Sequence, residues 1–186
     1  MTTTRISPNE IYAEKARRSF RAYCEFVHGV PDTDNVLVPL ELPPHFVYFE
    51  ATLTTQEPAE KATATSAPPE FWKSRTRRMY IEWSIGKYPE RARLLIMNTA
   101  AQATKQVMSV AETIERNPRY AMVFPHVVPD DNKQWNQSTL YIERPNAARP
   151  DATLFGTGVL GPIQGGHFEE IYLDDVTDPQ DVYPEK

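Results

Sequence analysis

Two short groups of residues could together handle a nucleoside triphosphate. Lys73-Ser74 offers an amine and a hydroxyl, and about 100 residues later Asp174-Asp175 offers two carboxylates after the apolar run Ile171-Tyr172-Leu173. In nucleotide-hydrolysing cores a lysine contacts the phosphates and a serine or threonine hydroxyl binds Mg²⁺. An acidic pair at the end of a buried strand holds the metal and its waters and orients the attacking water. The sequence therefore suggests a phosphate site assembled from two distant parts of the chain.

The loop around Lys73 departs from the usual phosphate-loop pattern. The fingerprint G-x-x-x-x-G-K-[ST] expects a glycine directly before the lysine, where the chain has Trp72. Pro68 and Pro69 carry no backbone N–H and cannot donate to an anion. Residues 61–66, which should feed the loop, are far less apolar than a central parallel strand. The pattern alone indicates a degenerate loop.

Composition limits the class of protein. The chain has 186 residues, of which 40% are hydrophobic and 24% charged, enough for one domain with a real core. Its 17 prolines against 7 glycines favour stiff, extended connections. The single cysteine, Cys24, excludes an internal disulfide and is typical of a reducing cytoplasm. No apolar run approaches the ~20 residues that span a bilayer, the N-terminus lacks a secretory signal, and the four histidines show no metal-ligand spacing.

Charge is distributed unevenly around the net value of −5. Residues 71–93 hold seven lysines and arginines against two glutamates, whereas residues 120–186 hold four basic residues against eleven acidic ones. A basic stretch that begins at a suspected phosphate site would attract polyanions. The alternative is an ordinary solvated helix face.

Periodicity predicts helices in the first half of the chain. Ser7-Pro8-Asn9-Glu10 forms a capping-box pattern, and apolar residues then recur at helical spacing, which predicts a helix over 8–28 that stops at Gly29. Residues 30–44 are proline-rich and irregular, residues 45–53 form a short apolar helix or strand, and residues 54–68 form a linker or a poor strand. A further helix is predicted over 73–86.

The second half alternates between strands and helices. Strands are predicted at 94–97, 139–143, 153–155 and 169–173, and the segment 120–124 is apolar up to Pro125. Thr99 is a candidate cap for a helix over 100–116, whose inner face would be Ala103, Val107, Val110, Ala111 and Ile114. The expected fold class is α/β, a mainly parallel sheet flanked by helices behind an N-terminal helical segment.

An ordered series of segments resembles a known family. The series comprises Ala67-Pro68-Pro69-Glu70-Phe71-Trp72-Lys73-Ser74-Arg75, Tyr80-Ile81-Glu82-Trp83-Ser84-Ile85-Gly86-Lys87-Tyr88-Pro89, Met97-Asn98-Thr99-Ala100 with Gln102-Ala103, Asn117-Pro118 before Val123-Phe124-Pro125, Lys133 and Trp135, Gly161-Pro162-Ile163-Gln164-Gly165, and Ile171-Tyr172-Leu173-Asp174-Asp175. In this order it resembles the ATPase domain of the large subunit of tailed-phage terminases, the motor that packages DNA. Leu42-Pro43-Pro44-His45 matches more loosely ahead of it.

The resemblance implies a partial P-loop ATPase domain over 61–186 behind an N-terminal helical segment over 1–60. Lys73 would contact ATP phosphates, Ser74 and Asp174 would bind Mg²⁺, and Asp175, where a catalytic glutamate is common, would orient water. The loop residues Pro69, Glu70, Phe71, Trp72, Lys73, Ser74 and Arg75 would surround the nucleotide. Expected partners are double-stranded phage DNA, the portal protein and the small terminase subunit, in an oligomeric ring in the host cytoplasm, encoded by a phage or a prophage.

The same resemblance leaves other interpretations open. Pro69 stands where many terminases have an arginine, and the chain ends eleven residues after Asp175, before the nuclease domain that similar proteins carry. A truncated, catalytically inactive remnant or assembly module is therefore one alternative, and a helicase-like P-loop ATPase is another. Arg144 or Arg149 could stabilise transition-state charge. Trp83 and Trp135 are interpreted as packing residues, and His167 and Asp130-Asp131 as turn residues.

Overall fold

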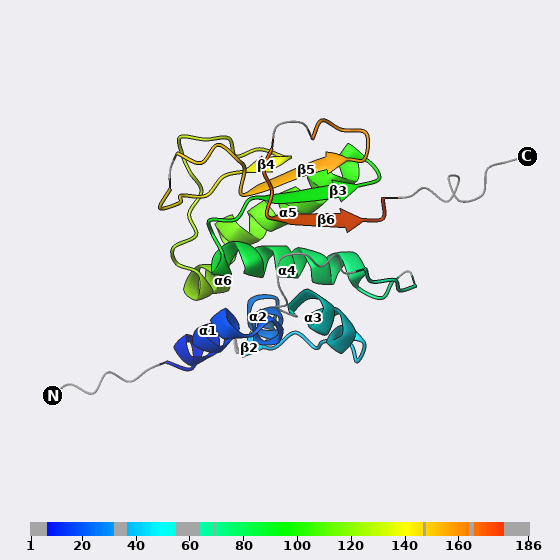
Figure 1. Ribbon diagram of the computed structural model, residues 1–186. Helices are drawn as coiled ribbons and strands as arrows, with labels where there is room; N and C mark the ends of the chain where they lie inside the picture. Colours follow the sequence, from blue (N-terminus) through cyan, green and yellow to red (C-terminus); the bar gives the residue numbers. More distant parts are fainter. Residues whose placement is uncertain are drawn as a thin grey trace, which may run out of the picture. The chain divides into compact units, whose positions relative to one another are not determined.

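A computed structural model describes residues 7–31, 37–54, 64–68, 70–146, 148–163 and 166–176 (Figure 1). The chain divides into two compact units that interleave in sequence. Unit 1 comprises Met1–Lys87 and Asn117–Pro125, and unit 2 comprises Tyr88–Arg116 and His126–Lys186. The boundary predicted between residues 60 and 61 lies outside the described residues.

Unit 1 is helical. Its elements are α1 (Pro8–Arg18), α2 (Phe20–Val27), α3 (Phe46–Thr54), α4 (Lys73–Lys87), α6 (Pro118–Val123) and a pair of two-residue strands, β1 (Val30–Pro31) and β2 (Leu37–Val38). The predicted capping box is confirmed, because the Ser7 hydroxyl accepts from the Glu10 N–H while the Glu10 carboxylate accepts from the Ser7 N–H. The helix predicted over 8–28 is two helices. Ser19 adopts an extended backbone between them, and its hydroxyl caps α2 by accepting from the Ala22 N–H.

Helix α4 is fixed in the core of unit 1 by buried polar contacts. The Glu82 side chain is fully buried, and its carboxylate accepts from the Tyr23 hydroxyl at 3.0 Å and lies 2.8 Å from the His28 Nε2. The Trp83 indole N–H donates to the Ala16 carbonyl, and the Tyr120 hydroxyl donates to the Glu82 carbonyl. Because buried polar groups are costly unless they are paired, these bonds define one position for α4 against α1, α2 and α6.

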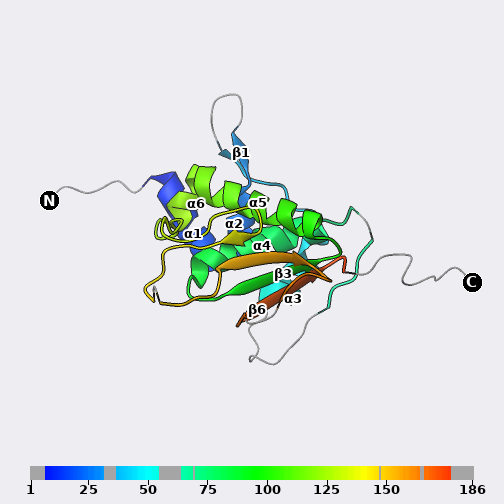
Figure 2. The same ribbon diagram turned by 90° about the horizontal axis from the view of Figure 1, so that it is seen from above.

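Unit 2 contains a sheet packed on one long helix. The described strands β3 (Arg93–Met97), β4 (Thr139–Leu140), β5 (Leu154–Gly158) and β6 (Glu170–Asp174) form a sheet in the order β4-β5-β3-β6. Strand β3 is parallel to β5 and to β6, whereas β4 is antiparallel to β5. Figure 2 shows β3 and β6 running in the same direction. The predicted α/β class is confirmed at this level, with a mixed sheet.

Helix α5 (Ala100–Arg116) covers one face of this sheet. Thr99 and Gln102 cap it reciprocally, as each side chain accepts from the other residue's backbone N–H. The predicted inner face is confirmed for Ala103, Val107, Val110 and Ile114, which are buried, while Ala111 is partly exposed. Gly156 of β5 faces this helix, because a Cβ there would lie 2.5 Å from the Val107 Cγ2. The close helix–sheet approach therefore requires a residue without a side chain at this position.

Several strand limits differ from the sequence-based expectation. The strand predicted over 139–143 pairs as a strand only at Thr139–Leu140, followed by an isolated bridge between Ile142 and Pro129. The strand predicted over 153–155 continues through Gly158, because β5 pairs with all five residues of β3. The ambiguous segment 45–53 is helical as α3. No helix in the described part of the chain is long and apolar enough to cross a membrane.

Candidate functional site

The predicted phosphate-binding residues lie at the start of α4 in unit 1. Lys73 and Ser74 are its first two residues and are half-buried, and the Thr76 N–H donates the first helical hydrogen bond to the Trp72 carbonyl at 2.7 Å. The first N–H groups of a helix have no partner inside the helix, and the dipole adds positive potential there. Such an end suits a phosphate group when a lysine and a hydroxyl stand beside it.

The backbone just before α4 is unusual. Trp72 has φ of 59° and Glu70 has φ of 68°, both in the left-handed region. Bulky residues rarely adopt this region, which glycine adopts without steric cost. Position 72 is where the phosphate-loop fingerprint has its second glycine. The tryptophan thus occupies the backbone conformation that a glycine would supply.

Side chains around this turn hold it in place. The Arg75 guanidinium carbon lies 4.1 Å from the centroid of the Trp72 ring, a cation–π contact, and burial lowers the pKa of that guanidinium. The Phe71 ring lies 4.6 Å from the His45 ring, centroid to centroid. The segment Leu42-Pro43-Pro44-His45 therefore contacts the loop before α4, inside unit 1.

The segment that leads into the loop forms no strand where it is described. Residues 64–68 have no regular structure, and residues 61–63 and Pro69 lie outside the described residues. Residues 61–66 are expected from the sequence to be too polar for a central strand, and the irregular conformation of residues 64–66 agrees with that expectation. A phosphate loop normally connects a strand to a helix. The structure has the helix after the loop but no strand in residues 64–68, so the match to this motif is incomplete.

The predicted acidic pair lies at the end of β6 in unit 2. Asp174 is the last residue of β6 and is 4% exposed, and Asp175 follows it with φ of 45° and an exposed side chain. Met97 of β3 is in register with both Asp174 and Gly158 of β5. Three parallel strands therefore end together at this edge, and the carboxyl ends of parallel strands are where α/β sheets bind ligands.

The structure brings the predicted residues together in two groups rather than one. Lys73, Ser74 and the loop residues from Glu70 to Arg75 belong to unit 1, whereas Asp174 and Asp175 belong to unit 2. Their convergence on one nucleotide stays a prediction. A hydroxyl and a carboxylate are oxygen donors of the kind Mg²⁺ prefers, alongside phosphate oxygens and water. Within the described residues no three His, Cys, Asp or Glu side chains gather to hold a metal by themselves.

The candidate arginines are engaged at the other end of the sheet. The Arg144 guanidinium donates to the Thr153 hydroxyl at 2.8 Å and to the Asp151 carbonyl at 2.9 Å, next to the amino end of β5. Arg149 pairs with Glu169, just before β6 begins. Because Asp174 closes the carboxyl end of β6, both arginines lie at the opposite end of the sheet from the carboxylates at which the phosphate to be stabilised is expected.

The basic stretch over 71–93 is only partly available to a polyanion. Arg93 is 0% exposed and bonds Glu170 at 3.1 Å, and Arg91 pairs with the same carboxylate at 2.8 Å. The Lys87 amine lies 4.3 Å from the Trp83 ring centroid. These three cations stabilise their own units, so a nucleic-acid contact would fall to the basic residues in the first turns of α4.

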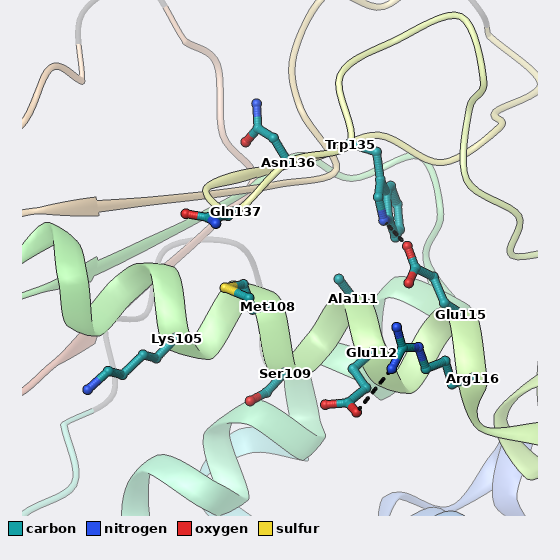
Figure 3. Close-up of a pocket in the computed structure, with 10 residues that line it drawn as sticks. All are labelled: Lys105, Met108, Ser109, Ala111, Glu112, Glu115, Arg116, Trp135, Asn136 and Gln137. Atoms are coloured by element: carbon teal, nitrogen blue, oxygen red, sulfur yellow. Dashed lines mark hydrogen bonds and ion pairs between the residues drawn. The ribbon is translucent and has the colours of Figure 1, made fainter.

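A hollow on the outer side of α5 was not predicted from the sequence. It has a volume of about 590 Å³ and lies between the helix and the turn that carries Trp135. Figure 3 shows the Trp135 indole beside Glu115, to which its N–H donates a hydrogen bond. Arg116 and Glu112 pair on the same helix, so the charges of the lining largely offset one another. Trp135 is partly exposed and lines this hollow, and its role as a packing residue stays a prediction.

Comparisons of the chain with protein-family models, with curated proteins and with solved structures gave no match.

Proposed function

We propose that this chain is the ATPase portion of a tailed-phage terminase large subunit, which couples ATP hydrolysis to the packaging of double-stranded DNA. In this proposal the Lys73 amine contacts the β- and γ-phosphates, and Ser74 and Asp174 bind Mg²⁺. Asp175 orients the attacking water, and the backbone from Glu70 to Arg75 surrounds the nucleotide. The partners would be the portal protein and the small terminase subunit, in a ring in the host cytoplasm.

The backbone at Trp72 is the observation that carries the proposal. Its φ of 59° directly before Lys73 lies in the left-handed region that glycine adopts readily, and glycine is the residue that the phosphate-loop fingerprint has at this position. A bulky residue is found there only when its surroundings hold it. A backbone suited to glycine at the position where the fingerprint has glycine supports descent from a phosphate loop.

A second candidate is a non-catalytic assembly module that keeps the fold. The irregular conformation of residues 64–68 favours it, because a phosphate loop is normally fed by a strand. Asp175 favours it as well, since aspartate is one methylene shorter than the glutamate that is common at this place. Such a module would bind nucleotide weakly or not at all and would not hydrolyse it.

Titration of the full chain with a fluorescent ATP analogue and Mg²⁺ tests the proposal. We expect Lys73→Ala to weaken binding about tenfold or more, because it removes a charge-assisted contact to phosphate. Lys87→Ala is the matched control, since Lys87 ends the same helix and lies over Trp83. It should leave binding unchanged.

Hydrolysis separates the two candidates. Phosphate release that Asp175→Asn abolishes would support the motor ATPase, and nucleotide binding without release would support the non-catalytic module. If the chain binds no nucleotide, or if Lys73→Ala and Lys87→Ala behave alike, the phosphate-site proposal fails.

A further inference from the structure

Strand β6 leaves one of its edges without a strand partner in the described part of the chain. It is the last strand in the order β4-β5-β3-β6, and Figure 1 shows it at the border of the sheet. The Glu170 N–H donates to the Ala92 carbonyl, toward β3. Because backbone groups alternate along a strand, Ile171 and Leu173 direct their N–H and C=O groups away from β3. This edge can therefore accept another strand.

The side chains of this edge are apolar and exposed. Ile171 is 59% exposed and Leu173 is 55% exposed. Gly156 faces α5, and Leu95 and Tyr172 are in register with it, so these three positions share the face that α5 covers. Because side chains alternate along a strand, Ile171 and Leu173 lie on the opposite face. Natural sheets usually protect an edge with lysine, proline or a bulge. Neither exposed position has such protection.

The two ends of β6 differ in charge. Its amino end gathers four arginines and four acidic residues, which offset one another, whereas its carboxyl end has two aspartates, for −2: Arg91, Arg93, Arg144, Arg149, Glu90, Asp151, Glu169 and Glu170 at the first end, Asp174 and Asp175 at the second. A strand that pairs antiparallel with an identical β6 would keep the two acidic ends apart and set each of them beside the end that carries the arginines. The edge is thus complementary to itself.

We propose that β6 pairs antiparallel with β6 of a second copy of this chain, with Tyr172 beside the two-fold axis. In this register Ile171 of one copy lies opposite Leu173 of the other. Both residues direct their backbone groups outward, so each pair exchanges two main-chain hydrogen bonds. Each pair also joins two apolar side chains on one face. An isologous contact of this kind closes on itself as a dimer.

The oligomeric state of the full chain tests this pairing. We expect sedimentation equilibrium to show a reversible monomer–dimer equilibrium. Leu173→Pro removes the outward N–H while leaving the bonds between β6 and β3, as prolines do on edge strands. Because two hydrogen bonds are lost per dimer, the dissociation constant of the dimer should rise about tenfold or more. Leu173→Val is the matched control, which keeps the N–H and an apolar side chain and should still dimerise.

Cysteine cross-linking tests the register. Residues opposite each other at a non-hydrogen-bonded pair have Cα atoms about 4.5 Å apart, within reach of a disulfide. We therefore expect Tyr172→Cys to cross-link two copies under mild oxidation and Ile171→Cys alone not to do so. Cys24 is buried and serves as the background in all variants.

Three results would overturn the proposal. One is a chain that stays monomeric over the whole accessible concentration range. Another is a dimer that Leu173→Pro and Leu173→Val affect equally, with both variants unfolding at the wild-type temperature. The third is cross-linking at position 171 instead of 172. These experiments contain no nucleotide, so their outcome can be told apart from the outcome of the nucleotide titration.

Discussion

The least expected residue in the molecule is Trp72. A left-handed backbone costs an L-residue about 1–2 kcal/mol, and glycine avoids that cost. Here the contact with Arg75 offsets part of it, since a cation–π pair at a partly exposed site contributes about 0.5–1 kcal/mol. The turn is therefore held by side chains rather than by an intrinsically permissive residue.

Two substitutions at position 72 separate these contributions. Trp72→Ala and Trp72→Gly both lose the contact with Arg75, but only alanine keeps the steric cost of φ near 59°. We expect the glycine variant to be more stable than the alanine variant by about 1 kcal/mol, measured by urea unfolding. Equal stabilities would mean that the left-handed conformation at this position is not retained in solution.

Sequence reasoning at the residue scale found what local patterns encode. The caps at Ser7 and Thr99 follow from hydroxyls placed three residues before a partner, and the structure confirms them. The buried state of Arg93 could not be predicted, because its partner Glu170 is 77 residues away along the chain. The two halves of the candidate phosphate site were each located by local motifs, but their convergence depends on how two units are arranged.

At the scale of elements, helix α4 shows how packing can override helix propensity. Replacing glycine by alanine inside a helix normally stabilises it by about 1 kcal/mol. At Gly86, however, a Cβ would lie 2.2 Å from the Phe124 ring carbons Cγ and Cδ2. The Phe124 Cγ lies close to the backbone and cannot move away as the end of a flexible side chain can. The steric clash should therefore outweigh the gain in helix propensity.

We therefore expect Gly86→Ala to destabilise the protein by about 1–2 kcal/mol, the cost of an overpacked core less the helical gain. Thermal and urea unfolding measure the change. Combining Gly86→Ala with Phe124→Leu should recover part of the loss, since the smaller side chain makes room. A stabilised Gly86→Ala variant would contradict the close approach of α4 and Phe124.

The start of β6 is sensitive to pH through Glu169. Burial raises the pKa of its carboxyl, but the Arg149 guanidinium and the Ala92 N–H lower it more, so the net pKa lies below the ordinary 4.5. A lowered pKa in the folded state means stability that is present above the unfolded-state pKa and is lost as the pH falls. The stability difference between wild type and Glu169→Gln should therefore shrink between about pH 6 and pH 3.

Urea unfolding at a series of pH values measures that difference. Glu10 and Glu14, whose pKa values are also lowered by their partners, remain in both proteins and cancel. A difference that stays constant down to pH 3 would show that Arg149 and Glu169 do not interact in solution.

Elements with a regular apolar pattern could be predicted from the sequence, whereas elements whose limits depend on contacts with other elements could not. Helix α5 was found with its limits and four of its five inner residues, because its apolar stripe is regular. The break at Ser19 was missed because the apolar pattern continues across it. Strand β5 was predicted too short, since Gly156 and Gly158 look like a turn until α5 and β3 are seen to require them.

At the scale of the whole molecule, the interleaving of the units makes each depend on a distant segment. Unit 1 is completed by α6, whose Tyr120 hydroxyl bonds the Glu82 carbonyl. The Asn117 side chain donates to the Val27 carbonyl, and Arg17 donates to the Val123 carbonyl at the end of α6. Residues 1–87 alone lack all these partners.

We expect a fragment of residues 1–87 to show no cooperative thermal unfolding, because Tyr23, whose ring packs against Phe124 in the full chain, is exposed when residues 117–125 are missing. Circular dichroism of the fragment, with and without an added peptide of residues 117–125, measures this. Recovery of a cooperative transition with the peptide would show that α6 is the missing part. A fragment that unfolds cooperatively by itself would show that α6 is dispensable.

The position of α6 in the chain also affects how the protein emerges from a ribosome. Translation proceeds from the N-terminus at about 5–20 residues per second, and domains usually fold in the order in which they appear. Here α1 through α4 leave the exit tunnel several seconds before α6, and β3 and α5 are made in between. Tyr23, whose ring contacts Tyr120 and Phe124 in the folded protein, lacks these partners for that interval, so we expect chaperones that bind apolar surfaces to bind the nascent helical half.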